Sequence, residues 1–293
     1  MSSIASGNKS FVGGGYHNTA SADSATVAGG ILNIASGYQS FIGGGQGNTA
    51  SANRTTVAGG AGNTASSNCA TVAGGQLNIA SGNQSTIAGG LSSIASGNCS
   101  FVGGGRCNSA SGDISFIGGG NNNTAAGNNS TITGGFSSKA SGGNSFIGGG
   151  CSNVASGSRS VIAGGYLNKA TTTDVFVGGG QNNIACGTCS VVAGGQLNIA
   201  SGQRSVVGGG HLNTASAGNS LVAGGGYNIA CGGSSTVTGG FSSLASGNGS
   251  IVGGNCNIAS GLRSTVGGGG LNIASGNNST IAGGLTNTAS GYQ

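Results

Sequence analysis

The sequence predicts an all-β fold, a single β-solenoid of about 19–20 fifteen-residue coils with two short strands in each coil. Three observations predict it. The pattern A-S-G-x-x-S-x-(V/I)-x-G-G-x-x-N-x returns every fifteen residues from Ala5 onward, Val or Ile stands at one place in every copy, and glycines stand at the same places between them. A period this strict indicates one unit copied along an axis and packed against its neighbours.

The repeat covers the whole chain, which we predict to be one continuous solenoid domain, residues 1–293. The recurring alanine is position 1 of each repeat, and positions are counted from it to 15. Alanines at position 1 run from Ala5 to Ala289 and enclose nineteen full repeats. The interval from Ala245 to Ala259 is one residue short, with the deletion near residues 253–256. We interpret it as a local irregularity in the solenoid.

Glycine content alone would suggest a fibrous or disordered chain, because the sequence has 69 glycines and no proline. A collagen helix needs Gly at every third residue together with proline, and neither is present. A disordered chain would lack a regular apolar residue, yet position 8 is Val or Ile in all nineteen repeats. We expect this row to form the buried core: Val12, Val27, Ile42, Val57, Val72, Ile87, Val102, Ile117, Ile132, Ile147, Ile162, Val177, Val192, Val207, Val222, Val237, Val252, Val266 and Ile281.

Two short extended segments are expected in each repeat. The first covers positions 6–9, as at residues 10–13, and the second runs from position 14 to position 2 of the next repeat, as at residues 18–21. Glycines at positions 3, 10 and 11 tolerate positive φ and are expected to form the corners. Alternation points positions 1 and 8 inward and positions 7, 9 and 15 outward. Coils stacked at about 4.8 Å would make a rod on the order of 90 Å long.

Asparagine recurs at position 14 in sixteen of the nineteen repeats, and Ser93, Ser138 and Ser243 replace it in the others. A catalytic asparagine would not be needed so often. Stacked amides can hydrogen-bond to their copies above and below, so we expect a structural ladder. Its members are Asn18, Asn33, Asn48, Asn63, Asn78, Asn108, Asn123, Asn153, Asn168, Asn183, Asn198, Asn213, Asn228, Asn257, Asn272 and Asn287.

Positions 7 and 9 carry no charged residue anywhere in the chain. Six repeats have Phe at position 7, and each of them has Gly at position 9, where most other repeats have Ala or Thr. Residues i and i+2 share a face, so this volume matching is typical of a packed surface. We call the outward face of positions 7 and 9 the stripe and predict that it is a subunit interface. Its predicted contact residues are Phe11, Phe41, Phe101, Phe116, Phe146, Phe176, Val191, Val206, Leu221 and Ile251.

Charge and hydropathy limit the partners. The eight Lys and Arg residues are scattered and the net charge is +5, so the basic cluster that nucleic-acid binding needs is absent. No run of about eighteen apolar residues is present, so we expect no membrane span. We also expect no signal peptide, because no basic stretch precedes an apolar run at the N-terminus.

The eight cysteines do not predict a disulfide framework. No two hold the same position in neighbouring repeats, where stacked coils would bring side chains close enough to bridge. Free thiols favour synthesis in a reducing compartment. The cysteines are Cys69, Cys99, Cys107, Cys151, Cys186, Cys189, Cys231 and Cys256.

Residues 78–90, N-I-A-S-G-N-Q-S-T-I-A-G-G, contain the S-x-(V/I)-x-G and N-x-A-x-G segments that recur along the chain. This repeat resembles the head repeats of trimeric autotransporter adhesins, the YadA-like or haemagglutinin-type units, and similar units in phage and large-virus fibre proteins. The resemblance covers essentially the whole chain, although the repeat is one residue longer than the usual family unit. It implies a left-handed parallel β-roll, three of which pack around an axis, and therefore a homotrimer in an extracellular fibre or on a virion surface.

Enzymes need acid, base or nucleophile groups that converge, and these are far apart here. His17 and His211 are separated by about thirteen coils, and Asp23, Asp113 and Asp174 lie in distant repeats. The glycine runs lack the Lys-Ser/Thr ending of a phosphate loop, and calcium-binding β-rolls need regular aspartates. We expect no catalytic residue, no cofactor and no bound metal.

Three functions remain open. The leading hypothesis is a structural fibre subunit that self-associates through the stripe and also end to end, because neither end of the repeats carries a polar capping coil. The second is a trimeric adhesin or virion-fibre head that binds a receptor or glycan at its corners. The corner aromatic residues are Tyr16, Tyr38, Phe136, Tyr166, Tyr227, Phe241 and Tyr292. The third is an ice-binding solenoid, in which Thr56, Thr71 and Thr86 align between Phe41 and Phe101.

Overall fold

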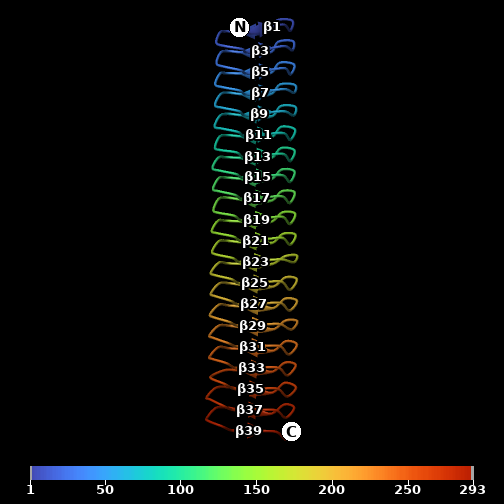
Figure 1. The fold of residues 1–293 in the computed structure, drawn as a ribbon. Helices are drawn as coiled ribbons and strands as arrows, with labels where there is room; N and C mark the ends of the chain where they lie inside the picture. The colour runs from blue at the N-terminus through green and yellow to red at the C-terminus, as the bar shows by residue number, and fades with distance from the viewer. Residues whose placement is uncertain (1, 292–293) are drawn as a thin grey trace. The chain divides into compact units, whose positions relative to one another are not determined.

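The computed structural model describes residues 2–291, which form strands and turns and no helix. Two compact units make up the chain, Met1–Gly150 and Cys151–Gln293. Each unit is a stack of short coils, in which Figure 1 labels the odd-numbered strands. One even-numbered strand follows each odd-numbered strand except the last, β39. The predicted fold class is confirmed, since the chain is an all-β parallel β-solenoid of about nineteen turns.

The odd-numbered strands occupy positions 15 and 1. In the first unit they are β1 (Ile4–Ala5), β3 (Thr19–Ala20), β5 (Ile34–Ala35), β7 (Thr49–Ala50), β9 (Thr64–Ala65), β11 (Ile79–Ala80), β13 (Ile94–Ala95), β15 (Ser109–Ala110), β17 (Thr124–Ala125) and β19 (Lys139–Ala140). In the second unit they are β21 (Val154–Ala155), β23 (Lys169–Ala170), β25 (Ile184–Ala185), β27 (Ile199–Ala200), β29 (Thr214–Ala215), β31 (Ile229–Ala230), β33 (Leu244–Ala245), β35 (Ile258–Ala259), β37 (Ile273–Ala274) and β39 (Thr288–Ala289).

The even-numbered strands occupy positions 7 and 8. In the first unit they are β2 (Phe11–Val12), β4 (Thr26–Val27), β6 (Phe41–Ile42), β8 (Thr56–Val57), β10 (Thr71–Val72), β12 (Thr86–Ile87), β14 (Phe101–Val102), β16 (Phe116–Ile117), β18 (Thr131–Ile132) and β20 (Phe146–Ile147). In the second unit they are β22 (Val161–Ile162), β24 (Phe176–Val177), β26 (Val191–Val192), β28 (Val206–Val207), β30 (Leu221–Val222), β32 (Thr236–Val237), β34 (Ile251–Val252), β36 (Thr265–Val266) and β38 (Thr280–Ile281).

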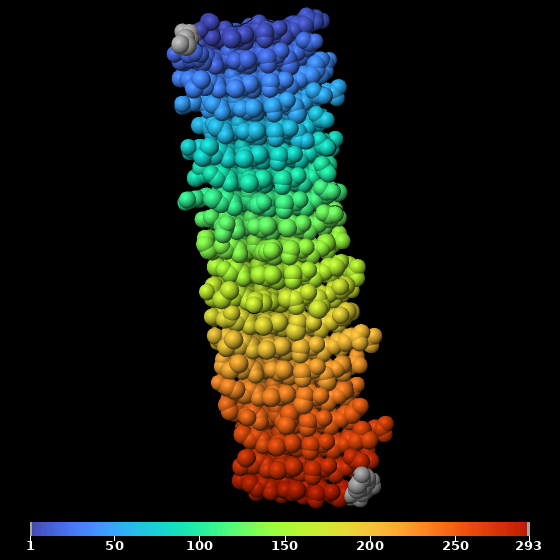
Figure 2. Space-filling model, turned by 45° about the vertical axis from the view of Figure 1, so that its right-hand side comes forward, coloured from blue at the N-terminus to red at the C-terminus, as the bar shows by residue number. Residues whose placement is uncertain are grey.

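Within each unit a strand pairs in parallel with the same strand of the next coil. Thr71 is opposite Thr86 in the first unit, and Val191 is opposite Val206 in the second. Identical positions therefore stack in rows. Figure 2 shows the successive coils as layers of atoms. A two-residue strand is too short to be stable alone, so each coil depends on its neighbours.

The structure adds a third ladder that the sequence analysis did not predict. Position 12 forms isolated parallel bridges from coil to coil, as between Tyr16 and Ile31 in the first unit and between Cys151 and Tyr166 in the second. No hydrophobic alternation surrounds this position, so its single-residue pairing has no period-two signal. Successive coils are therefore joined by three ladders rather than two.

The corners turn through residues that the sequence analysis did not single out. Positions 5 and 13 adopt left-handed backbone with non-glycine residues, for example Arg54 at φ 55° and Leu77 at φ 57°. In this conformation the backbone N–H group donates to the preceding coil instead of the following one. Strand residues donate to the following coil, whereas Arg54 N donates to Tyr38 O of the preceding coil over 2.7 Å, and Leu77 N likewise to Ala61 O over 2.9 Å. The ladder hydrogen bond helps to offset the backbone strain.

Glycine is needed at position 3 for a different reason from the one predicted. Position 11 does take positive φ, as at Gly75, but Gly82 at position 3 does not. A Cβ at Gly82 would lie 2.0 Å from the carbonyl oxygen of Gly97 in the next coil. The expectation of a positive-φ corner at position 3 was wrong, because glycine there permits close approach of stacked backbones.

Four side chains of each coil point into its core. Positions 1, 6, 8 and 14 point inward, as Ala80, Ser85, Ile87 and Asn78 show, each with 0% exposure. The Val/Ile row at position 8 is fully buried in the inner coils, and only Val12 and Ile281 near the two ends of the repeats retain some exposure. Burying one such side chain contributes about 1.5–3 kcal/mol.

The asparagines at position 14 hold neighbouring coils together through the backbone. The Nδ2 group of Asn63 donates to Gly59 O at 3.0 Å in its own coil and to Gly75 O at 2.9 Å in the next coil. The prediction of amide-to-amide bonds is wrong for Asn63 and most of the row, although Asn287 Nδ2 does donate to Asn272 Oδ1 over 3.1 Å. The side chains turn toward the glycine corners because the Gly59 carbonyl has no other hydrogen bond in the described structure, whereas Gly75 O also accepts from Ala61 N over 3.0 Å.

The fourteen-residue repeat lies in the second unit and keeps the pairing register. Leu244 is opposite Ile258 and Ile251 is opposite Thr265, fourteen residues apart. Gly253 N donates to Val266 O over 2.9 Å, as position 9 does elsewhere, and Gly253 O accepts from Asn257 Nδ2 over 2.6 Å, as position 10 does. One glycine thus serves two positions, and the deletion is absorbed at the corner.

Candidate interaction surfaces

In the first unit the stripe is an exposed row of aromatic and threonine side chains. Phe11 is 56% exposed, Phe41 40% and Phe116 39%, while Phe101 and Phe146 are half-buried. These residues occupy one ladder of even strands, since position 7 pairs with position 7 from coil to coil. Phe101 and Phe116 in adjacent coils stack with ring centroids 5.2 Å apart and planes 8° apart.

The Phe–Gly matching has an explanation within one chain. A Cβ added to Gly13 would lie 2.4 Å from the carbonyl oxygen of Ala28 in the next coil and 3.2 Å from the ring of Phe11. One added to Gly178 would lie 2.2 Å from Ala193 O and 3.3 Å from the ring of Phe176. Both the next coil and the ring therefore restrict the space at this glycine. Packing within one chain accounts for the pattern, so it is the exposure and lack of charge of the stripe that favour an interface.

In the second unit the stripe is mostly aliphatic, with Phe176 as its aromatic residue. Phe176 is 40% exposed, Leu221 36% and Ile251 42%, and Val191 and Val206 are half-buried. These five residues lie on the even strands of that unit and, like those of the first, include no charged group. Each unit thus brings its predicted contact residues onto a single strand face.

The structure shows a second weakly polar face that was not predicted from the sequence. Position 15 on the odd strands exposes Ile4, Ile34, Ile79 and Ile94 in the first unit, and its first charged residue is Lys139. Thr and Ile share this row, and serine stands at position 2 beside it in most coils. The sequence pattern could have indicated it, because only Lys139 and Lys169 break the row.

The two histidines belong to different units, His17 to the first and His211 to the second. His17 contacts the ring of its neighbour Tyr16, with centroids 4.0 Å apart, and no group of three or more His, Cys, Asp or Glu side chains in the described chain could hold a metal ion. All eight cysteines are free. The described residues include no helix of the length and hydropathy required to cross a membrane.

Among residues 2–291, one ion pair forms at the corners. Arg159 and Asp174 hold position 5 in adjacent coils of the second unit, and two hydrogen bonds of 2.5 and 2.7 Å join guanidinium to carboxylate. Arg159 lowers the pKa of Asp174 through these bonds, and Asp174 raises the pKa of Arg159. Both groups face solvent. Because identical positions stack, opposite charges fifteen residues apart were a usable sequence signal that the analysis missed.

Three corner rings of the second unit come together, although they are distant in sequence. Tyr227 contacts both His211 and Phe241, with ring centroids 5.4 and 5.2 Å apart. They belong to positions 12 and 13 of successive coils, and Gly226 leaves room beside the ring of Phe241. The other predicted corner rings Tyr16, Phe136 and Tyr166 are exposed separately, and Tyr292 lies outside the described residues.

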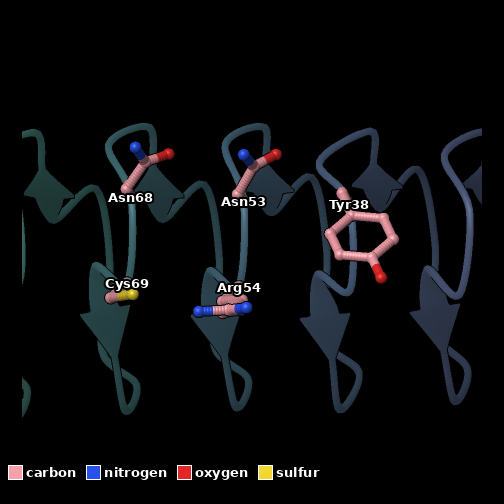
Figure 3. Close-up of a pocket in the computed structure, with 5 residues that line it drawn as sticks. All are labelled: Tyr38, Asn53, Arg54, Asn68 and Cys69. Carbon is pink, nitrogen blue, oxygen red and sulfur yellow. The ribbon is translucent and has the colours of Figure 1, made fainter.

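A shallow hollow of about 380 Å³ opens at a corner of the first unit, lined by Tyr38, Asn53, Arg54, Asn68 and Cys69. Three successive coils contribute, with Tyr38, Asn53 and Asn68 from position 4 and Arg54 and Cys69 from position 5. Figure 3 shows the two amides side by side, the Tyr38 ring beyond them, and Arg54 and Cys69 along the other side. Of these five residues, the sequence analysis had singled out Tyr38 as a binding residue.

The threonine row of the ice-binding alternative is less exposed than the Phe41 ring beside it. Thr56, Thr71 and Thr86 are half-buried, whereas Phe41 at one end of their row is 40% exposed.

No protein-family model matches the chain, and no curated protein matches its sequence.

Proposed function

We propose that this chain is a structural subunit that assembles with copies of itself through the stripe, as a homotrimeric fibre component. The observation that carries the proposal is the exposed, uncharged row of Phe side chains on one in-register strand face. Monomeric proteins rarely leave so extended an apolar surface in water, and such surfaces mark interaction sites.

The area available supports a stable contact. A Phe that is half exposed offers roughly 100 Å² of apolar surface, so burying it contributes about 2.5 kcal/mol. Phe11, Phe41 and Phe116 are 39–56% exposed and the other two phenylalanines of the first unit less so, and together the five offer roughly 400 Å². A typical stable interface buries about 800 Å² on each partner. The phenylalanines of one unit therefore supply about half of the required area, and the intervening threonines add to it.

A second copy is the partner that suits this surface best. The rows have the same period in every copy, so coils of two subunits can lie level along their length. Charged partners would find no complementary group on positions 7 and 9. Lys and Arg residues lie instead at corners and at position 15 of the odd strands, where they keep the outside of an assembly hydrated.

The test compares Phe116→Asp with Phe136→Asp, measured by light scattering after size-exclusion chromatography. Both side chains are exposed in the first unit, but Phe116 is on the stripe and Phe136 is at a corner, position 12. The unmodified chain should have an oligomeric mass that Phe116→Asp lowers and Phe136→Asp leaves unchanged. Val102→Asp, in the buried row, should instead abolish the β-sheet circular dichroism. A monomeric unmodified chain, or dissociation by Phe136→Asp alone, would refute the proposal.

The second candidate is a head that binds a receptor or glycan at its corners, and the hollow beside Tyr38 is the observation that favours it. Electron microscopy separates the two functions. Long fibres support a structural subunit that also joins end to end, and short discrete particles support a binding head.

A further inference from the structure

We infer that the hollow beside Tyr38 is a binding site for a saccharide that carries a carboxylate group. The site lies on corner positions 4 and 5, away from positions 7 and 9 of the stripe. It goes beyond the assembly function, and the failure of either proposal leaves the other standing.

The backbone of the hollow is held in place from coil to coil. Arg54 N donates to Tyr38 O over 2.7 Å, and Cys69 N donates to Asn53 O over 2.9 Å. Arg54 and Cys69 both have left-handed backbone, with φ of 55° and 58°. Side chains on this frame start from fixed points, which lowers the entropy lost when a ligand binds. The volume of about 380 Å³ is within the range of small-molecule sites, about 300–1,000 Å³.

Tyr38 supplies an apolar surface beside polar groups. Its side chain is 46% exposed. The ring offers a flat face on which the C–H face of a pyranose can stack, while the phenol hydroxyl stays hydrated. Among the position 4 residues of the described chain, Tyr38 is the single aromatic one.

Asn53 and Asn68 supply matched hydrogen-bonding groups. Within residues 2–291 neither side-chain amide has a hydrogen-bond partner, and in Figure 3 the two amides lie parallel in successive coils. Each offers one acceptor and two donors. Two such groups about 4.8 Å apart can bind adjacent sugar hydroxyls, each of which donates and accepts.

Arg54 supplies an uncompensated positive charge. Its Nε atom is 3.4 Å from the neutral Oε1 of Gln39, and it makes no ion pair within the described chain. Arg159 occupies the same position 5 but is neutralised by Asp174. A free guanidinium can bind a carboxylate through two parallel hydrogen bonds. This charge favours an acidic sugar over a neutral one.

Among the described residues, no other unpaired arginine at position 5 has the same surroundings. Arg204 has Thr188, Gln203 and Gly218 at the position 4 sites around it, and Arg263 has Asn248, Leu262 and Asn277. Each lacks the aromatic ring. Arg204 is therefore a control for nonspecific attraction of an anion.

Ligand binding can be followed through Cys69, because its exposed thiol lines the hollow. Cys99 is also exposed at position 5, two coils further on, and its Sγ lies 3.3 Å from Gln84 Oε1 outside the hollow. A ligand in the hollow should shield the first thiol and leave the second open. The rate of alkylation by iodoacetamide, read by mass spectrometry for each peptide, compares them in one sample.

The probes are the methyl glycosides of N-acetylneuraminic acid and glucuronic acid, with methyl glucoside and inorganic sulfate as controls, all at millimolar concentration. We expect at least one acidic glycoside to slow Cys69 alkylation several-fold and to leave the Cys99 rate unchanged. Tyr38→Ala and Arg54→Gln should each weaken this protection about tenfold, a loss typical of one good contact, whereas Arg204→Gln should not. The side chains of Tyr38 and Arg54 are exposed, so we expect their substitution to leave the fold intact.

Other results would overturn the inference. Equal protection by methyl glucoside would show that Arg54 selects no carboxylate. Equal protection by sulfate would show a simple anion site without saccharide recognition. Equal slowing of Cys69 and Cys99, or no protection by any probe, would show that the hollow is not the site of binding.

Discussion

The side-chain oxygen of Asn63 accepts a hydrogen bond of 3.0 Å from the backbone nitrogen of Asn78, fifteen residues further along the chain. The same amide donates to Gly59 O and to Gly75 O. One buried side chain therefore satisfies three backbone groups in two coils, and the pattern recurs through both units. Neighbouring coils are held together at the core side of the glycine corner as well as by the strand ladders.

Replacing this amide should destabilise the stack locally. Asn63→Ala leaves Asn78 N and Gly59 O without a partner in the described structure, while Gly75 O keeps its hydrogen bond from Ala61 N. We expect a loss of about 3 kcal/mol from the two groups, which cost about 1–3 kcal/mol each. The measurement is hydrogen exchange at the backbone N–H group of Asn78, which should become at least a hundredfold faster.

Asn63→Ser is the control for that substitution, because serine already fills the position at Ser93, where its Oγ is 3.3 Å from Asn108 N. In Asn63→Ser, the backbone amide of Asn78 should exchange at a rate between those in the unmodified chain and in Asn63→Ala. Equal exchange rates in all three proteins would contradict the role of the amide.

The buried serine row at position 6 offers a matched pair of substitutions. Ser264 Oγ donates to Gly261 O over 2.9 Å, whereas Ser115 Oγ is buried without a partner in the described structure. Ser264→Ala should cost about 1 kcal/mol, and Ser115→Ala should be neutral or stabilising, because it removes an unsatisfied polar group. Urea denaturation monitored by circular dichroism compares them, and a larger loss for Ser115→Ala would contradict the hydrogen-bond assignment.

The Arg159–Asp174 pair should respond to acid. Arg159 holds the pKa of Asp174 below its ordinary value, so the folded state binds this proton less tightly than the unfolded state. The stabilisation is present above the unfolded pKa and is lost as pH falls through the folded pKa. Arg159→Gln should raise the pKa of Asp174 toward its ordinary value, as followed by carboxyl carbon NMR.

Because both groups face solvent, high salt should produce a smaller shift in the same direction as Arg159→Gln. An Asp174 titration that is unchanged in the variant would exclude the pair in solution.

Two cysteines at position 2 should differ in reactivity. Cys186 is half-buried and burial raises its pKa, whereas Cys231 in the same unit is exposed. Because the thiolate is the nucleophile, Cys186 should react with iodoacetamide several-fold more slowly than Cys231 at pH 8. The difference should disappear in denaturant. Equal rates in the folded protein would show that Cys186 is open to solvent.

Much of the coil could be predicted from recurrence alone. Position 8 is Val or Ile in every repeat, and the structure buries Ile42 and Val57 completely. Repetition also indicated which residues stack, since position 7 in one coil must meet position 7 in the next. The Phe101–Phe116 stack follows directly from that register.

The corners were harder to predict, because their conformations depend on hydrogen bonds between coils. Arg54 and Leu77 adopt left-handed backbone although neither is a glycine, and no local preference signals this. Gly82 is required by the carbonyl group of Gly97, which lies in another coil. The hollow beside Tyr38 likewise exists because three coils place their corner side chains together.

The sequence by itself determined the period of the chain, its all-β coil, its buried Val/Ile row and the absence of charge on the stripe. These follow from recurrence, which needs no knowledge of the third dimension. Only the tertiary structure decided that Asn63 bonds to glycine carbonyls rather than to another amide, that position 12 forms a third ladder, and that Arg159 is neutralised while Arg54 is not. The physical reason is that these are contacts between coils, where backbone direction and side-chain reach select the partner.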